Sequence, residues 1–271
     1  MTVQDALARS SIQHIDAEIL LCSVLKRERT WLLAHQETQL SSAEKQQWST
    51  FMERRSRFEP SAYITGEREF YGRNFFVDAS VLIPRPATEQ LVQTTLRIMQ
   101  GDMVKQVIPA DEQIVIATYV WGDIASLRTI ADIGTGSGCI AVTLTCERPD
   151  FRMIATDISS DTLRIARRNA KRHNVLSQVK FLQGNALKPL SCLKEPFLVV
   201  SNPPYIPEGT AMMRDVIDYE PHEALFSGKD GMNVIRTIMK DARQHPQCVG
   251  VVIECMEKQA DLIVHPTSTL S

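Results

Sequence analysis

The stretch Ala131-Asp-Ile-Gly-Thr-Gly-Ser-Gly138 decides the fold, because it holds three of the chain's 12 glycines within five residues. The apolar residues 129–133 predict a strand, and the residues from Cys139 onward predict a helix. Glycines at such a junction let the backbone turn tightly and approach a ligand, and the N–H groups at the helix start attract polar or anionic groups. On this motif alone, a tight turn without any ligand stays an alternative.

The chain beyond this stretch alternates between strands and helices. The apolar patterns predict strands at 152–156, 179–182, 197–200 and 249–254, and helices at 161–173 and 232–243. This alternation predicts an α/β domain with a mostly parallel sheet and helices on both faces.

The region before the stretch has a different texture. From Ala6 to about Phe58 the apolar residues recur every three or four positions, which predicts helices, and Ser41 with Glu44 has the spacing of a capping box. Residues 68–71 and 75–77 then predict a β-hairpin.

The segment between the hairpin and the glycine-rich stretch is less uniform. Ile83-Pro-Arg-Pro86 predicts a rigid extended loop, and Thr88 is expected to cap a helix from Glu89 to about Met99. Residues 113–121 are apolar enough for a strand or a buried helix, and the sequence leaves this open. We therefore expect a helical domain at 1–60, a hairpin and linker at 61–87, and an α/β domain at 88–271.

Composition excludes several classes of protein. Lys and Arg number 30 and Asp and Glu 32, so a net charge of -2 argues against a polycation that works mainly on nucleic acid. With 44% hydrophobic and 23% charged residues, the chain is a globular protein. No apolar run is long enough to cross a membrane and residues 1–11 lack a signal core, so we expect a cytoplasmic location.

The six cysteines are scattered without the spacing of metal ligands, so we expect no metal site and buried thiols. They are Cys22, Cys139, Cys146, Cys192, Cys248 and Cys255.

Asp157 adds to the glycine-rich stretch. It closes the next predicted strand about 20 residues on, as expected for a carboxylate that binds ribose hydroxyls. The alternative is an N-cap, a role that Asp157 would share with Ser159 or Ser160. Together the two elements indicate a nucleoside-containing cofactor, either a dinucleotide or S-adenosylmethionine. The glycine spacing lacks the later helix-packing glycine of dinucleotide sites, and no P-loop lysine follows, which disfavours a dinucleotide and ATP hydrolysis.

Ser201-Asn-Pro-Pro-Tyr205 follows the predicted strand 197–200, at the edge of the sheet where ligands collect. The Asn202 side-chain oxygen and the proline carbonyls can accept hydrogen bonds from an amino group, and Tyr205 offers a flat face to a planar amide or base. Such a site would orient a planar nitrogen toward an electrophilic methyl group without a general base at the start. A proline-rich turn without a ligand is the alternative.

These motifs resemble those of class I S-adenosylmethionine-dependent methyltransferases that act on exocyclic or amide nitrogens. The Asn-Pro-Pro-Tyr (NPPY) motif alone is shared by DNA adenine-N6, some RNA guanine-N2 and protein glutamine-N5 enzymes. Residues 62–72, 81–89 and 219–225, and the helical leader, are similar to the peptide chain release factor glutamine methyltransferases, the PrmC/HemK family.

The resemblance implies a Rossmann-like class I methyltransferase domain and a helical domain that grips its substrate. The implied reaction is N5 methylation, by S-adenosyl-L-methionine, of the glutamine in the Gly-Gly-Gln loop of class 1 release factors, which act in translation termination. The implied cofactor residues are Gly134, Thr135, Gly136, Ser137, Gly138, Asp157, Asn185 and Asn202. The implied catalytic residues are Asn202, Pro203 and Tyr205, and these would bind the substrate together with Pro204 and Arg85. Neither a membrane nor direct nucleic-acid binding is expected.

The chain also departs from the family pattern. Ala87 stands where the family usually has an acidic residue, and Asn185-Ala186 where it often has an acidic or aromatic pair. Only residues 255–271 follow Glu254, and the pattern of 264–271 does not predict a paired strand. The sequence therefore leaves undecided whether the sheet lacks the family's final antiparallel strands. Two other functions stay open: an adenine-N6 nucleic-acid methyltransferase, and a catalytically weak paralogue that only binds the translation machinery.

Overall fold

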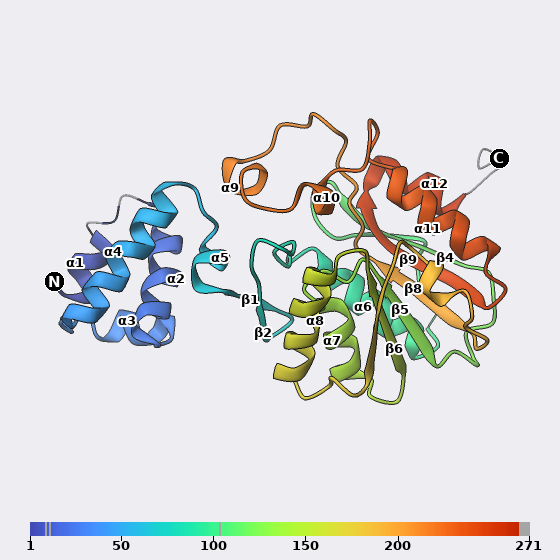
Figure 1. Ribbon diagram of the computed structural model, residues 1–271, viewed down its shortest axis with the longest axis horizontal. Coiled ribbons are helices and arrows are strands. Elements are labelled where there is room, and N and C mark those ends of the chain that lie inside the picture. The colour runs from blue at the N-terminus through green and yellow to red at the C-terminus, as the bar shows by residue number, and fades with distance from the viewer. Residues whose placement is uncertain (9, 11, 103, 266–271) are drawn as a thin grey trace. The chain divides into compact units, whose positions relative to one another are not determined.

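A computed structural model describes residues 1–8, 10, 12–102 and 104–265, which form two compact units (Figure 1). The first unit consists of Met1–Glu67 and Met212–Tyr219, and the second of Arg68–Ala211 and the chain from Glu220 onward. The domain boundaries expected above stay predictions. The sequence did not predict that a short later segment belongs to the first unit.

The first unit is helical, as predicted. Its core is made by apolar residues such as Leu20, Leu32 and Trp48. The predicted capping box is confirmed, because the Ser41 side chain accepts from the Glu44 N–H group and the Glu44 carboxylate accepts from the Ser41 N–H group. The helices are α1 (Val3–Ala8), α2 (His14–Leu25), α3 (Arg29–Ala34), α4 (Ser42–Ser56), α5 (Ser61–Thr65) and α9 (Arg214–Ile217).

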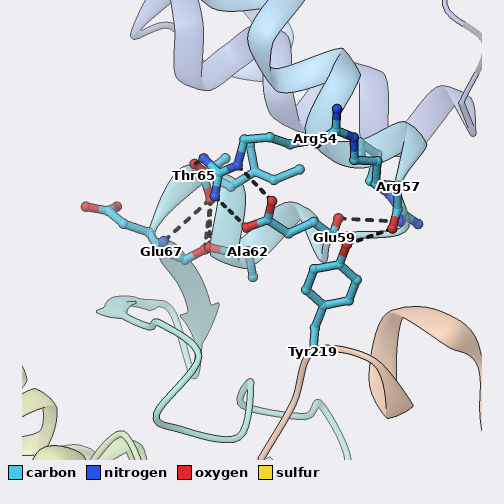
Figure 2. Close-up of polar contacts among 9 residues, drawn as sticks. Arg54, Arg57, Glu59, Ala62, Thr65, Glu67 and Tyr219 are labelled. Atoms are coloured by element: carbon cyan, nitrogen blue, oxygen red, sulfur yellow. Dashed lines mark hydrogen bonds and ion pairs between the residues drawn. The ribbon is translucent and has the colours of Figure 1, made fainter.

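The segment Met212–Tyr219 is bound to the first unit by specific polar contacts. The Tyr219 hydroxyl donates to the Arg57 carbonyl oxygen at 2.7 Å, next to the ion pair of Arg54 with Glu59 (Figure 2). The side chain of Arg55 forms ion pairs with Asp16 of α2 at 2.8 Å and with Asp215 of α9 at 3.7 Å. The segment Met212–Tyr219 therefore belongs to the helical unit, although the stretches before and after it in the sequence belong to the second unit.

The second unit contains a seven-stranded sheet in the order β3-β4-β9-β8-β5-β6-β7. Five of its strands are parallel, and β4 runs antiparallel to both of its neighbours. The predicted mostly parallel sheet is therefore confirmed. The strands are β3 (Val107–Pro109), β4 (Ile114–Val120), β5 (Thr129–Ile133), β6 (Arg152–Asp157), β7 (Val179–Gln183), β8 (Phe197–Ser201) and β9 (Cys248–Met256).

The antiparallel pair comes from a part of the chain that the sequence left open. Strand β4 pairs along its whole length with β9, with Ile116 opposite Glu254 and Val120 opposite Gly250, and β3 pairs with its outer edge. Residues 107–120 thus supply an antiparallel pair beside β9, and in the described residues up to 265 no further strand follows β9, in agreement with the expected lack of final strands. Residues 266–271, part of the segment not expected to form a strand, lie outside the described residues.

Helices cover both faces of the sheet, as predicted (Figure 1). Adjacent residues of one strand, such as Ile130 and Ala131, belong to the two different cores because strand side chains alternate in direction. Helices α6 (Thr88–Met99), α7 (Cys139–Glu147) and α8 (Ser160–Arg172) pack on one face, and α11 (Asn233–Gln244) and α12 (Ala260–Val264) on the other.

The remaining elements, a hairpin and short helices, lie in the connecting segments. The predicted hairpin is confirmed as β1 (Glu67–Phe70) and β2 (Arg73–Phe76), and short helices follow at α10 (His222–Leu225), η1 (Lys188–Leu190) and η2 (Glu257–Gln259). The predicted cap by Thr88 is wrong, because Ala87 occupies the N-cap of α6 and the Thr88 side chain bonds elsewhere.

All six cysteines are free thiols. The prediction of buried thiols holds for Cys139, Cys248 and Cys255 and is wrong for Cys192, which is exposed. Within the described ranges, no three His, Cys, Asp or Glu side chains come together as metal ligands. None of the helices in the described part of the chain has the length and apolar character needed to span a membrane.

Candidate active site

A cavity of about 290 Å³ lies at the carboxyl ends of the parallel strands, inside the second unit. Its wall includes the glycine turn after β5, Asp157 at the end of β6, Asn185 after β7, and Asn202 after β8. The fold explains this meeting, because parallel strands end at one edge of the sheet and their following loops converge there.

The glycine turn is held by the backbone of the neighbouring strand. The N–H groups of Gly134 and Thr135 both donate to the Thr156 carbonyl oxygen, at 2.9 and 2.8 Å. Gly134 and Gly136 have φ angles of +71° and +57°, which other residues rarely adopt, and a Cβ atom at either would meet nothing within 4 Å. The turn therefore leaves open space beside its backbone.

Gly138 has another role. Its φ is +81°, and a Cβ atom there would come within 3.1 Å of the Ala166 backbone in α8. It is therefore a helix-packing glycine, which the spacing of the motif did not predict.

Asp132 braces the turn from inside the protein. One of its oxygens, Oδ2, accepts from the Thr135 hydroxyl at 2.6 Å and from the Ala141 N–H group at 3.2 Å. The other, Oδ1, is buried and has no hydrogen-bond partner among the described residues. Burial raises the pKa of Asp132 to about 7, although these hydrogen bonds oppose the shift. Sequence reasoning missed this residue, although it lies inside the quoted stretch.

Asp157 connects the turn to the next strand. Its carboxylate accepts from the Gly136 N–H group at 3.1 Å and from the Ser159 N–H group at 3.0 Å. The N-cap of α8 is Ser159, which accepts from the Thr162 N–H group, so the N-cap alternative for Asp157 is wrong. Burial raises the pKa of Asp157, and the backbone hydrogen bonds oppose that rise.

The loop after β7 contributes Gly184, Asn185 and Ala186 to the cavity wall. A Cβ atom at Gly184 would lie 2.5 Å from Pro189, so only glycine fits there. No aromatic side chain of the described residues lines the cavity, and the exposed Ile158 offers the wall a large aliphatic surface instead.

Asn202, Pro203 and Pro204 line the same cavity. The Asn202 amide nitrogen donates to the Thr88 hydroxyl oxygen at 3.0 Å, and no described residue donates to the Asn202 side-chain oxygen. Asn202 therefore lines the cavity with a side-chain oxygen that remains available as an acceptor, and its predicted hydrogen bond to a substrate amide stays a prediction.

Tyr205 does not line the cavity. Its hydroxyl donates to Glu254 Oε1 at 3.1 Å, and its carbonyl oxygen accepts from the Gln259 side chain at 2.9 Å. Burial and the neighbouring Glu254 raise the pKa of Tyr205, so its phenol stays a neutral donor. The predicted packing of Tyr205 on a substrate amide stays a prediction.

Arg85 lines the cavity and forms an ion pair with Glu220 at 2.5 Å. The Glu220 side chain is only 1% exposed and also accepts from the Ile83 N–H group at 3.1 Å. A carboxylate from the stretch 219–225 thus fixes the Ile83-Pro-Arg-Pro86 loop. Sequence reasoning assigned no role in the site to Glu220 or Glu254, and it assigned Thr88 only a helix cap. An acidic residue at the end of the apolar strand 249–254 was a usable signal.

Two family models match separate parts of the chain. Residues 3–66 match the PrmC N-terminal domain family, and residues 123–225 match the Methyltransferase small domain family. The solved N-terminal domain of human METTL16 is 16% identical, with 89% of this chain and 80% of that chain covered and a TM-score of 0.46, so the likeness is loose.

Curated relatives are more similar. A bifunctional methyltransferase of Rickettsia typhi is 37% identical over 93% of this chain, and the chain spans about half the length of this and two other Rickettsia relatives. A release factor glutamine methyltransferase of Coxiella burnetii is 37% identical over 87% of this chain and 76% of its own length. Another, from Nitratidesulfovibrio vulgaris, is 35% identical over 95% and 81%. The chain therefore belongs to the release factor glutamine methyltransferase family.

Proposed function

We propose that this protein methylates the side-chain amide nitrogen, N5, of the glutamine in the Gly-Gly-Gln loop of class 1 peptide chain release factors, with S-adenosyl-L-methionine as donor. The observation that carries the proposal is the Asn202 side-chain oxygen, an acceptor in a cavity that also contains the glycine turn and Asp157. Membership of the family supports the reaction. Because the substrate belongs to the translation machinery, we expect the protein in the cytoplasm.

The residues present fit the proposed cofactor. The space beside Gly134 and Gly136 is open to a ligand, and the Asp157 carboxylate can accept hydrogen bonds from ribose hydroxyls. Asn185 carries both a donor and an acceptor for the edge of an adenine ring. When bound, S-adenosylmethionine supplies an electrophilic methyl group.

The chain's own residues would then orient the acceptor nitrogen. The Asn202 side-chain oxygen and the Pro203 carbonyl would accept the two hydrogens of the substrate amide and fix its plane in the cavity. Neither Pro203 nor Pro204 has an N–H group, so these two positions offer no backbone donor that would bind the amide in the wrong orientation. These acceptors also stabilise the positive charge that develops on the nitrogen, which can lose its proton after the transfer.

The experiment uses S-adenosylmethionine with a labelled methyl group and a purified class 1 release factor. We expect one label on the glutamine of the Gly-Gly-Gln loop, located by mass spectrometry of its peptides. A release factor with that glutamine changed to alanine is the matched control and should take up no label; label on this control would contradict the proposal. DNA and RNA are offered in parallel, and label on either would favour the adenine-N6 alternative. Absence of both transfer and cofactor binding would favour the paralogue that only binds.

A further inference from the structure

Glu254, near the end of β9, is a fully buried carboxylate directly behind the Asn-Pro-Pro-Tyr motif. Its exposed fraction is 0%, and its Oε1 atom accepts from the Tyr205 hydroxyl at 3.1 Å. Its Oε2 atom is buried and has no partner with hydrogen-bond geometry among the described residues. A buried carboxylate with an incompletely paired oxygen opposes folding, so a purely structural role would be served better by a neutral side chain.

The polar side chains around Glu254 connect it to the cavity. The Tyr205 hydroxyl connects Glu254 to the motif that contains Asn202, and the side chains of Thr88 and Asn202 act on the carboxyl group electrostatically, since they lower its pKa. Asn202 donates its amide nitrogen to the Thr88 hydroxyl oxygen at 3.0 Å, so the hydroxyl hydrogen of Thr88 is left to donate to another acceptor. A carboxylate can only accept hydrogen bonds. The charge of Glu254 therefore favours orientations in which the hydrogens of the Thr88 and Asn202 side chains point toward it.

The consequence is greatest for Asn202, because its side chain has two chemically opposite ends. A carboxylate and a hydroxyl oxygen on the inner side favour the amide nitrogen there, and the carbonyl oxygen then faces the cavity that Asn202 lines. The opposite rotamer would place two acceptors against each other and present a donor to the substrate amide.

We propose that Glu254 is a positioning residue for the transfer reaction: its buried negative charge, behind the motif and bonded to Tyr205, favours the orientation of Asn202 with its amide nitrogen toward Thr88 and its carbonyl oxygen toward the substrate. This inference rests on the proposed function for the identity of that substrate. The orientation of Asn202 itself is a property of the protein alone, and it can be measured without a release factor.

The first test is Glu254→Gln, which keeps the shape and removes the charge. An amide at this place is neutral and carries donor hydrogens of its own, so it no longer favours orientations in which the hydrogens of Thr88 and Asn202 point toward it. We expect kcat to fall by at least about tenfold, with KM for the release factor and Kd for S-adenosylmethionine unchanged within about twofold. The midpoint of thermal unfolding at pH 8 should stay the same or rise.

The matched control is Glu195→Gln, the same chemical change in a partly exposed carboxylate that pairs with Arg152 at the opposite edge of the sheet. It should leave kcat, KM and Kd unchanged. If kcat and stability of Glu254→Gln fall together, or if that variant does not fold, Glu254 has a structural role and the proposal is wrong.

Thr88 provides a second, independent variant pair. Thr88→Val removes the hydroxyl and keeps the shape, and should lower kcat about as much as Glu254→Gln; Thr88→Ser keeps the hydroxyl and should restore most of the rate. The double variant Glu254→Gln with Thr88→Val should be little slower than either single one, because both changes break the same connection. Additive losses would contradict the proposal.

The orientation of Asn202 is tested by nuclear magnetic resonance of its side-chain amide group, identified by the loss of its signal in Asn202→Asp. We expect its hydrogens to exchange slowly with solvent in the unchanged protein and at least about tenfold faster in Glu254→Gln. Equal exchange in both would overturn the inference. If the unchanged protein methylates no release factor, the proposed function fails, while this measurement still decides the role of Glu254.

Discussion

The two sides of the cavity are built in different ways. On the side of the glycine turn, backbone N–H groups of the turn donate to the Thr156 carbonyl oxygen of the neighbouring strand and to the Asp157 carboxylate. On the side of Asn202, side chains make them, and the partners Thr88 and Glu254 come from distant parts of the chain. The glycine-turn side of the cavity therefore depends on glycine residues and local backbone geometry, whereas the Asn202 side depends on individual side-chain atoms.

The largest effect, a fall in kcat, is expected on the Asn202 side of the cavity. Asn202→Ala removes an acceptor whose contact becomes stronger as positive charge develops on the substrate nitrogen, so kcat should fall by about 10²–10³-fold. Kd for S-adenosylmethionine, measured by calorimetry, should change by less than about threefold. Asn185→Ala is the comparison on the other side and should mainly raise Kd; equal losses of kcat and cofactor affinity in Asn202→Ala would mean that this residue mainly shapes the cofactor site.

The next largest effect, a loss of affinity for S-adenosylmethionine, is expected on the glycine-turn side of the cavity. Asp157→Asn removes a charge that would accept from ribose hydroxyls, and hydrogen bonds to charged groups contribute about 1.5–3 kcal/mol. We therefore expect Kd for S-adenosylmethionine to rise by about 10–100-fold in calorimetry, while kcat at saturating cofactor changes little. Asp161→Asn, in an exposed side chain four residues further along, is the control and should leave Kd unchanged. A normal Kd for Asp157→Asn would remove this residue from the cofactor site.

The difference between the two sides also explains what could be predicted from the sequence. The turn and Asp157 were recognisable because their residues are close in the chain and their types are required by backbone geometry. Glu220 and Glu254 were not, because their partners Ile83 and Tyr205 lie 137 and 49 residues away. A buried carboxylate is indistinguishable from an exposed one until the fold brings its donors together.

The fold shows the same division. The strand–helix alternation from residue 129 onward predicted the parallel sheet, since each pattern is local. The sequence did not decide whether the residues of β4 form a strand or a helix, because an apolar run buried on both faces lacks the periodicity that distinguishes the two. Its partner β9 is also more than 100 residues away in the sequence. Only the structure therefore shows which residues form the antiparallel pair.

A smaller effect concerns the packing of the turn side. Gly138→Ala places a methyl group 3.1 Å from the Ala166 backbone at a φ of +81°, so it adds a steric clash to conformational strain. We expect its free energy of unfolding in urea to fall by about 2–3 kcal/mol. Gly209→Ala has a similar φ of +80° with nothing within 4 Å and isolates the strain, at about 1 kcal/mol. Equal losses in the two variants would show that α7 and α8 do not depend on this close approach.

The smallest effect is the pH dependence of stability caused by Glu254. Burial raises the pKa of this carboxyl from an ordinary value of 4.5 to about 7, and the hydrogen-bonding groups of Thr88 and Tyr205 oppose the rise. Because the folded protein binds this proton more tightly than the unfolded chain does, the contribution of Glu254 to stability falls as pH rises from about 4.5 to 7 and is constant above that range. Glu254→Gln removes this contribution, so its unfolding midpoint relative to the unchanged protein should be several degrees higher at pH 8 than at pH 5. Thermal unfolding from pH 5 to 8 measures this difference, and Asp132 contributes equally to both curves and cancels. A difference independent of pH would mean that the pKa of Glu254 is the same in the folded and unfolded chains, so burial would not raise it. The carboxylate on the Asn202 side of the cavity would then be charged throughout this pH range.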